Sequence, residues 1–233
     1  MNIAIIGGNG FIGRSIFNFF VKKKIKIAKI LRNSKFKDFI NNSDIIIHSA
    51  NSGSKFEAEN NKENDHKNSV QLTKKIFDVF KNKKIILIST ISSRMESNIY
   101  SRNRYECEKI ILQNSSNLVI RLPLMFNPIN KRGILYDLVM NKKIYCGKNT
   151  NINSVTRSTI SYEVYDNIFN NNIIEIGNYN KKNLLFLSNE LNSKSTFEGP
   201  DKNFIIDNNI VNKKYDINKV IKLLKIYKRL NKV

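Results

Sequence analysis

Short apolar runs alternate with amphipathic stretches along the first half of the chain. The runs are apolar through the middle, as expected of parallel strands covered on both faces, and predict strands at residues 2–6, 25–31, 43–51, 84–90 and 117–122. The stretches between them predict helices at residues 14–20, 35–41, 65–82 and 98–113, and a polar loop at residues 52–64. This alternation predicts a parallel sheet with helices on both faces.

A glycine cluster joins the first strand to the first helix. Residues 7–13 read Gly-Gly-Asn-Gly-Phe-Ile-Gly and fit both Gly8-x-Gly10-x-x-Gly13 and Gly7-x-x-Gly10-x-x-Gly13. In such turns one glycine allows positive φ, one lets a pyrophosphate touch the main chain, and one lets the helix pack closely. The amino end of the helix attracts phosphate. The cluster predicts a dinucleotide site, and its alternative is a strand–helix turn without a ligand.

Composition and charge narrow the possible classes. A chain of 233 residues with 41% hydrophobic residues can bury one good core. Its apolar runs are too short for a signal peptide or an integral membrane span, and Cys107 and Cys146 form no disulfide or metal pattern, so we expect a cytoplasmic protein without a metal. The lysines behind the net charge of +21 are spread along the chain, so a nucleic-acid partner is not expected.

Two polar residues near predicted strands bear on the cofactor. Arg32 follows the second strand, where an acidic residue would hold a ribose 2′-hydroxyl and an Arg accommodates a 2′-phosphate. Arg32 therefore favours NADP, while NAD stays possible because a solvated Arg is equally compatible with the sequence. His48 in the third strand has no Cys or carboxylate at ligand spacing, so we expect it to be packed or hydrogen-bonded rather than a metal ligand or base.

Five segments within the first 130 residues match one family in order. They are residues 6–13, 44–50, 87–90, 100–109 and 119–123. With them the chain resembles the extended short-chain dehydrogenase/reductases, in particular the NAD(P)-dependent epimerases, dehydratases and reductases of nucleotide-linked sugars. The resemblance implies an α/β fold, a Rossmann-like doubly wound parallel sheet with a small C-terminal substrate lobe. It implies cofactor contacts from Gly7, Gly10, Phe11, Ile12, Gly13, Arg32, Ala50 and Pro123.

The resemblance also implies a set of catalytic residues. In the family a Tyr exchanges a proton with the substrate, a Lys one helical turn later holds the nicotinamide ribose and favours the Tyr anion, and a Ser or Thr ends a nearby strand. Tyr100 matches the Tyr, and Thr90 matches the Ser or Thr that would hold the reacting oxygen. The Lys position holds Arg104, whose guanidinium is larger, planar and permanently charged. We expect Thr90, Tyr100 and Arg104 to be the catalytic residues.

A second pair in the same helix has the literal Tyr-x-x-x-Lys spacing. It consists of Tyr105 and Lys109. Five residues turn a helix by roughly 140°, so the two pairs cannot both face one nicotinamide. Tyr100 and Arg104 share a stripe with apolar residues, whereas Tyr105 and Lys109 lie with Glu108 on a more polar side. We favour Tyr100 with Arg104 and keep the second pair as the alternative.

The second half of the chain has diverged further from the family pattern. Residues 1–126 are expected to form the dinucleotide-binding core, and residues 127–233 a small substrate-binding lobe that is not an independent domain. Within the lobe, the sequence predicts a helix at residues 133–141 and a small strand at residues 143–146. It also predicts a strand–helix join that returns towards the core at residues 159–168, and a basic amphipathic helix at residues 216–230. We expect the last helix, which opens on Asp216, to dock on the domain rather than on a membrane.

The expected function is an NAD(P)-dependent reductase or epimerase of a nucleotide-activated (deoxy)sugar, in surface polysaccharide biosynthesis. Family members commonly pair through the helices that contain Tyr100 and Asp65, so a homodimer is possible. The alternative is a catalytically degenerate NAD(P)-binding protein with a regulatory or assembly role. Two features keep it open, namely Arg104 in place of Lys and the short interval of ten residues from Thr90 to Tyr100.

Overall fold

The computed structural model describes residues 1–51, 55–95, 97–129, 131–178, 180–207 and 211–232. The chain divides into two compact units. The first contains Met1–Arg121 and Ile160–Ile174, and the second contains Leu122–Thr159 and Glu175–Val233. Each unit is therefore built from two separate pieces of sequence.

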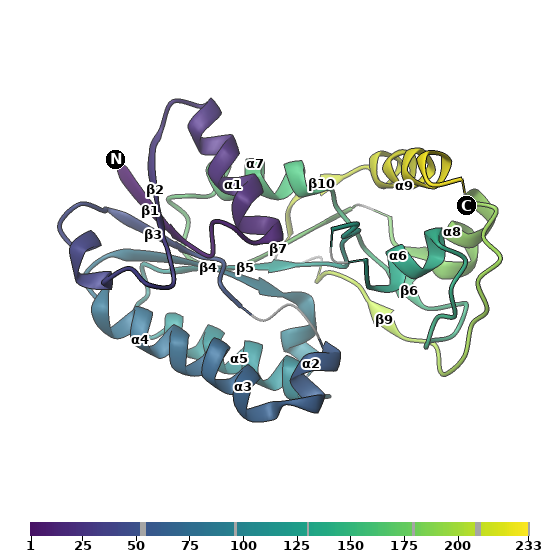
Figure 1. The fold of residues 1–233 in the computed structure, drawn as a ribbon, viewed down its shortest axis with the longest axis horizontal. Coiled ribbons are helices and arrows are strands. Elements are labelled where there is room, and N and C mark those ends of the chain that lie inside the picture. Colours follow the sequence, from purple (N-terminus) through teal and green to yellow (C-terminus); the bar gives the residue numbers. More distant parts are fainter. Residues whose placement is uncertain (52–54, 96, 130, 179, 208–210, 233) are drawn as a thin grey trace. The chain divides into compact units, whose positions relative to one another are not determined.

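A seven-stranded sheet has the order β10-β7-β5-β4-β3-β1-β2 (Figure 1). Its strands are β1 Asn2–Ile6, β2 Lys26–Ile30, β3 Ile45–His48, β4 Lys84–Thr90, β5 Leu118–Leu122, β7 Asn172–Asn178 and β10 Val211–Tyr215. The pairs β1–β2, β1–β3, β3–β4 and β7–β10 are parallel. Because β2 and β3 flank β1 on opposite sides, the winding reverses between β1 and β3, where ligands bind in such sheets.

Helices cover both faces of the sheet in the first unit (Figure 1). One face carries α1 Phe11–Lys22 and α7 Arg157–Asp166, joined by a 2.8 Å hydrogen bond between the hydroxyl groups of Ser15 and Ser161. The other face carries α4 Leu72–Val79 and α5 Ile99–Ile111. The segment 159–168 returns to the core as expected, but it does so as helix α7. The doubly wound fold predicted from the alternating pattern is confirmed.

The connection from β3 to α4 differs from the prediction. Within the stretch expected to be a loop, residues 55–64, the chain forms α2 Lys55–Asn60 and begins α3 Lys62–His66, while residues 52–54 lie outside the described ranges. A π-helical turn, η2 Lys67–Gln71, then leads into α4. The loop prediction was wrong because Asn61 caps α3, accepting a hydrogen bond from the Asn64 amide at 3.1 Å, and because tertiary contacts bury Asp65.

Two short 3₁₀ helices complete the first unit. The first, η1 Phe36–Phe39, lies where a short helix was expected after β2. The second, η3 Ile91–Met95, follows β4 directly and packs against α5. Thr90 is the last residue of β4, so η3, which packs against α5, begins directly after Thr90.

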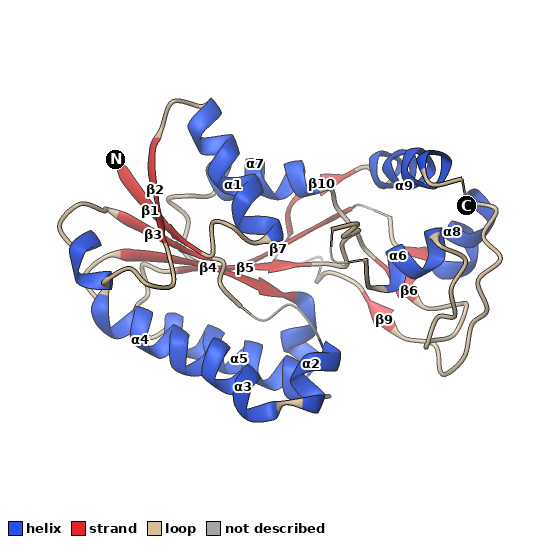
Figure 2. Ribbon diagram, in the orientation of Figure 1, coloured by secondary structure: helices blue, strands red, loops and turns tan. Residues whose placement is uncertain are grey.

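The described part of the second unit contains a small mixed sheet and the helices α6, α8 and α9 (Figure 2). Besides β10 and most of β7, its elements are α6 Ile134–Val139, β6 Asn151–Ile152, β8 Lys182–Asn183, α8 Leu184–Glu190, β9 Asn203–Phe204 and α9 Asn218–Leu230. Strand β6 pairs antiparallel with β8 and parallel with β9. The small strand expected at residues 143–146 is only a single bridge between Ile144 and Phe197. The short β-region there depends on a distant partner rather than on local pattern.

The last helix docks on its own unit, as predicted. In α9, Val220, Ile221 and Leu224 are buried, and the Tyr227 ring lies 5.0 Å from that of Phe126. Asp216 accepts a 2.9 Å hydrogen bond from the Asn218 amide at the start of the helix. Among the described residues, no helix combines the length and apolar character needed to cross a membrane.

Candidate functional site

The glycine turn between β1 and α1 is shaped by backbone contacts. Gly7 has a φ of +85°, and a Cβ there would lie 2.7 Å from the Ala50 amide nitrogen. A Cβ on Gly13 would lie 2.2 Å from the Gly7 carbonyl oxygen, which also accepts a 2.9 Å hydrogen bond from the Gly10 amide. A Cβ on Gly8 would lie 3.0 Å from the Lys29 side chain and 3.1 Å from that of Ile5, and a Cβ on Gly10 would lie 3.2 Å from the Gly7 carbonyl oxygen. The geometry therefore requires glycine at positions 7 and 13 and is tight at positions 8 and 10.

The amino end of α1 opens on this turn. Gly10 is the N-cap residue, and the first turn, which the structure describes in full, contains no acidic side chain. Phe11 and Ile12 are half-buried, and Gly13 is buried against the turn. A helix amino terminus of this kind has the N–H groups and the dipole that attract a phosphate.

Two residues outside the turn were also predicted to contact the cofactor, and a third residue was missed. Arg32 is exposed beyond the end of β2, and Pro123 is buried after β5 in the second unit. Lys29 was missed: its Nζ donates a 2.9 Å hydrogen bond to Asn9 Oδ1 in the glycine turn and lies 4.3 Å from the Phe17 ring centroid. Successive side chains of a strand point to opposite faces of the sheet, and this alternation along β2 was the only signal in the sequence that the Lys29 side chain lies on the face covered by α1.

The structure brings two of the three expected catalytic residues into contact on α5. The helix begins after Asn98, whose Oδ1 accepts a 2.9 Å hydrogen bond from the Ser101 amide. Tyr100 is half-buried in the first turn, and the guanidinium carbon of Arg104 lies 4.7 Å from its ring centroid. This is the range of a cation–π interaction. Thr90 ends β4, and its hydroxyl oxygen accepts a 3.3 Å hydrogen bond from the Ser92 amide.

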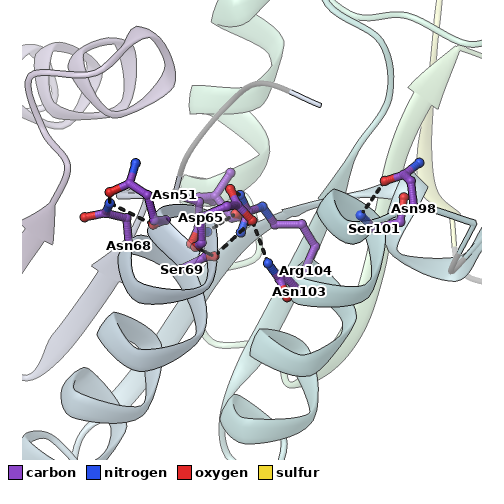
Figure 3. A network of polar contacts seen from close by, with 10 residues as sticks. Asn51, Asp65, Asn68, Ser69, Asn98, Ser101, Asn103 and Arg104 are labelled. Atoms are coloured by element: carbon purple, nitrogen blue, oxygen red, sulfur yellow. Dashed lines mark hydrogen bonds and ion pairs between the residues drawn. The ribbon is translucent and has the colours of Figure 1, made fainter. Parts of the chain in front are cut away.

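Arg104 is buried, with only 2% of its side chain exposed, and its partner is an aspartate from another helix. Asp65 on α3, also 2% exposed, has its Oδ1 atom 3.2 Å from Arg104 Nη2 (Figure 3). Asn103 Nδ2 donates a 2.7 Å hydrogen bond to Asp65 Oδ2. Sequence reasoning missed Asp65, because an acidic residue in a polar stretch is usually solvated. Asp65 therefore brings a negative charge beside Tyr100 and Arg104, the pair expected to act in catalysis.

A buried polar group lies behind Arg104. Burial and, to a smaller extent, the charge of Arg104 lower the pKa of His48 to about 3. His48 Nε2 is 3.0 Å from Thr73 Oγ1, and the Ala50 amide donates a 3.4 Å hydrogen bond to His48 Nδ1. Burial raises the pKa of the Cys107 thiol, which also interacts with Thr73 and Arg104. The packed, hydrogen-bonded role predicted for His48 is confirmed.

The alternative dyad lies on a more exposed side of α5. Lys109 is exposed, Tyr105 is half-buried, and Lys109 Nζ is 4.9 Å from the Tyr105 ring centroid. Glu108 does not share this exposure, contrary to the prediction. It is 1% exposed, and Arg121 Nη2 lies 2.6 Å from its Oε2 atom. Glu108 is drawn inward because β5 provides a buried cation as its partner.

Metal chemistry finds no support in the described part of the chain. No group of three or more His, Cys, Asp or Glu side chains there is arranged to hold a metal ion.

Comparison with family models finds no match, and comparison with curated proteins also finds none. Solved structures do match. UDP-glucose 4-epimerase from Thermotoga maritima, solved with UDP-glucose, has a TM-score of 0.81 at 14% identity, covering 100% of both chains. MoeE5, in complex with UDP-glucuronic acid and NAD, has a TM-score of 0.82 at 10% identity, again covering 100% of both chains.

A third structure shares the same fold. The dTDP-4-dehydrorhamnose reductase from Bacillus anthracis, in complex with NADP, has a TM-score of 0.77 at 13% identity, covering 97% of this chain and 99% of that chain. The similarity extends over the whole chain, although the sequences are only 10–14% identical. The chain therefore has the same fold as these three proteins.

Proposed function

We propose that this chain is an NAD(P)-dependent reductase or epimerase of a nucleotide-activated (deoxy)sugar, with NADP as its preferred cofactor. The observation that carries the proposal is the glycine turn, where Gly7 and Gly13 have no room for a Cβ and lie beside the reversal of the sheet. Related folds were solved with UDP-glucose, with NAD and with NADP, which supports this choice of ligands. A role in surface polysaccharide biosynthesis stays a prediction.

The residues of the glycine turn fit a dinucleotide. Because Gly7 and Gly13 lack a Cβ, the turn, the segment at Ala50 and the amino end of α1 pack closely together, and the N–H groups at that end of the helix would hold a pyrophosphate. Arg32 would meet the 2′-phosphate of NADP. The full set proposed to contact the cofactor is Gly7, Gly10, Phe11, Ile12, Gly13, Arg32, Ala50 and Pro123. When bound, the nicotinamide donates or accepts a hydride.

The chain itself would provide the proton and the orientation. Tyr100 would donate a proton to the substrate oxygen or remove one from it, and Thr90 would hold that oxygen by a hydrogen bond. Arg104 lies over the Tyr100 ring, so its positive charge would favour the phenolate. The expected contact of Arg104 with the nicotinamide ribose stays a prediction, because most of this side chain is covered by protein.

The test is turnover of NADPH with a panel of nucleotide-linked 4-keto-6-deoxysugars. We expect the purified chain to oxidise NADPH with one of them, and Tyr100→Phe to lower kcat by about a thousandfold while NADPH binding persists. Tyr105→Phe, in the same helix, is the matched control and should leave kcat unchanged. Inactivation by Tyr105→Phe instead would assign the chemistry to the second pair.

A second candidate function is dinucleotide binding without turnover. The observation that favours it is the buried pair of Arg104 and Asp65, since a cation bound to a carboxylate stabilises a nearby phenolate less than an isolated cation does. Calorimetric binding of NADPH, combined with no turnover of any sugar nucleotide in the panel, would support this regulatory or assembly role.

A further inference from the structure

Asp65 is a buried carboxylate for which the proposed chemistry has no direct use. It lies on α3, and Arg104 and Asn103, which bind its two oxygens, lie on α5, 39 and 38 residues later in the chain. Ser69 Oγ also donates to Asp65, to its backbone carbonyl oxygen and, at 3.4 Å, to its Oδ2 atom. The side chain is therefore held from two helical segments (Figure 3).

These contacts fix the Arg104 guanidinium. A guanidinium is planar with its donors in a rigid arrangement, so binding one of its nitrogens limits where the plane can lie. Asp65 holds Nη2 at 3.2 Å, and the guanidinium carbon stays 4.7 Å from the Tyr100 ring centroid. The Cys107 thiol also interacts with Arg104. Tyr100 is therefore next to a cation whose position and net charge both depend on Asp65.

We propose that Asp65 is a positioning residue that holds Arg104 against the Tyr100 ring and, by opposing its charge, sets how readily the Tyr100 phenol ionises. The inference rests on the proposed role of Tyr100 as the acid–base group. Asp65 acts through Arg104 and touches neither substrate nor cofactor. Its carboxylate lies 3.2 Å from the guanidinium and so opposes the positive charge next to the Tyr100 ring.

The other ionisable groups around α5 are weaker influences. His48 on β3 is buried, and with a pKa of about 3 it is uncharged at neutral pH. Buried Glu108 on α5 is bound by Arg121. Cys107 on α5 is buried, and burial raises the pKa of its thiol, so it is uncharged at neutral pH.

Glu59 on α2 is exposed and accepts a 2.7 Å hydrogen bond from the Ile99 amide, beside Tyr100. The other charged groups on α5 and on the elements packed against it are exposed or half-buried and therefore screened by solvent: Lys55, Glu57, Lys62, Glu63, His66, Lys67, Lys74, Lys75, Asp78, Lys84, Arg94, Arg102, Glu106 and Lys109.

The experiment follows the ionisation of Tyr100 by nuclear magnetic resonance of the full chain with isotope-labelled tyrosine. The Tyr100 signal is assigned by its loss in Tyr100→Phe. In Asp65→Asn we expect Tyr100 to ionise about one pH unit lower than in the parent. Asp78→Asn, which neutralises an exposed carboxylate on α4, is the matched control and should leave the Tyr100 titration unchanged. A folded Asp65→Asn that titrates like the parent overturns the proposal.

A second pair of variants covers the case in which Asp65→Asn does not fold. Arg104→Lys keeps a positive charge at this position but places it on a flexible side chain, which adapts more readily to the loss of the carboxylate, so the pair can be broken at lower cost. Tyr100 should ionise at lower pH in Asp65→Asn/Arg104→Lys than in Arg104→Lys alone, and equal titrations overturn the proposal. No cofactor or substrate is present, so a failed titration refutes the role of Asp65, whereas a failed turnover assay refutes the proposed function.

Discussion

The glycine turn and the pair of Asp65 and Arg104 lie in the same unit but are specified in different ways. In the turn, the need is steric: a Cβ on Gly13 would lie 2.2 Å from the Gly7 carbonyl oxygen, within one short segment. In the pair, the need is electrostatic: two side chains 39 residues apart are each 2% exposed and bind each other. A buried charge is tolerated only with such a partner.

The difference affects what each region contributes to function. Most of the turn can be inferred from its own sequence, because Gly13 packs against Gly7 within one segment of seven residues; only the approach of Ala50 to Gly7 comes from elsewhere in the chain. The contact of Arg104 with the Tyr100 ring follows from their helical spacing, whereas no local pattern reveals that Asp65, 39 residues before Arg104, binds its guanidinium. Cofactor binding and acid–base chemistry should therefore respond to different substitutions, and the predictions below separate the two.

The largest effect is expected in the turn. Gly13→Ala forces its Cβ against the Gly7 backbone, so the free energy of unfolding should fall by about 3 kcal/mol. The affinity for NADPH should fall at least about a hundredfold. Fluorescence titration with NADPH and urea unfolding measure the two effects. Gly8→Ala, whose Cβ would mainly meet the side chains of Lys29 and Ile5, is the control and should change both much less. Wild-type affinity in Gly13→Ala would contradict the steric argument.

The second effect concerns the other buried pair on α5. Arg121→Met leaves Glu108 buried without this cation, so the free energy of unfolding should fall by about 3 kcal/mol. Lys225→Met breaks a largely exposed pair with Glu190 and should cost less than about 1 kcal/mol. Thermal or urea unfolding compares them. Equal losses in the two variants would mean that burial does not control the cost.

The third effect is a pH dependence that comes from His48. The folded chain keeps His48 neutral down to a pKa of about 3, whereas the unfolded chain protonates it near pH 6.5. Between these values the unfolded state binds more protons, so stability should decline as pH falls, by at most about 1.4 kcal/mol per pH unit from this residue. Above pH 6.5 the contribution is constant.

Urea unfolding at several pH values measures this slope. In His48→Gln the slope between about pH 6 and pH 4 should be shallower than in the parent by about that amount. The only other histidine, half-buried His66, provides the control: His66→Gln should leave most of the slope intact. A parent and His48→Gln with the same slope would exclude His48 as its source.

The smallest effect is expected at Arg32. Its side chain is exposed, so its attraction for a 2′-phosphate is screened by solvent. Arg32→Gln should weaken NADPH binding by about fivefold, which is about 1 kcal/mol, and leave NADH binding unchanged. Lys22→Gln, at the far end of α1, controls for the loss of one positive charge. Equal weakening of NADPH and NADH would remove the argument for NADP.

Much of the first unit could be predicted from local pattern. The strand predicted at residues 84–90 is β4 Lys84–Thr90, and the helix predicted at residues 98–113 is α5 Ile99–Ile111. An apolar run or a 3.6-residue period is a local property of the sequence, so it predicts a strand or helix even when the residues that pack against that element are unknown. The buried side of α5 was also partly predicted, since Arg104 lies on its inner face.

The failures share a physical cause. The helices at α2 and α3 are polar, so their sequence carries no apolar stripe, and Asp65 becomes buried only because Arg104 and Asn103 receive it. Glu108 was expected on a polar side but is buried by Arg121. In each case the sign of the burial energy of a charged side chain depends on a partner elsewhere in the chain.

The sequence by itself therefore determined the strand, turn and helix around Gly7, Gly10 and Gly13. Gly10 and Gly13 are constrained by the nearby Gly7 carbonyl oxygen, whereas the close approach of Ala50 to Gly7 comes from the fold. It also determined the alternating pattern that builds the doubly wound sheet. Only the tertiary structure decided that Asp65 meets Arg104 beneath Tyr100. The physical reason is range: backbone sterics act within a few residues, whereas a buried charge is stabilised by whichever opposite charge the fold brings to it.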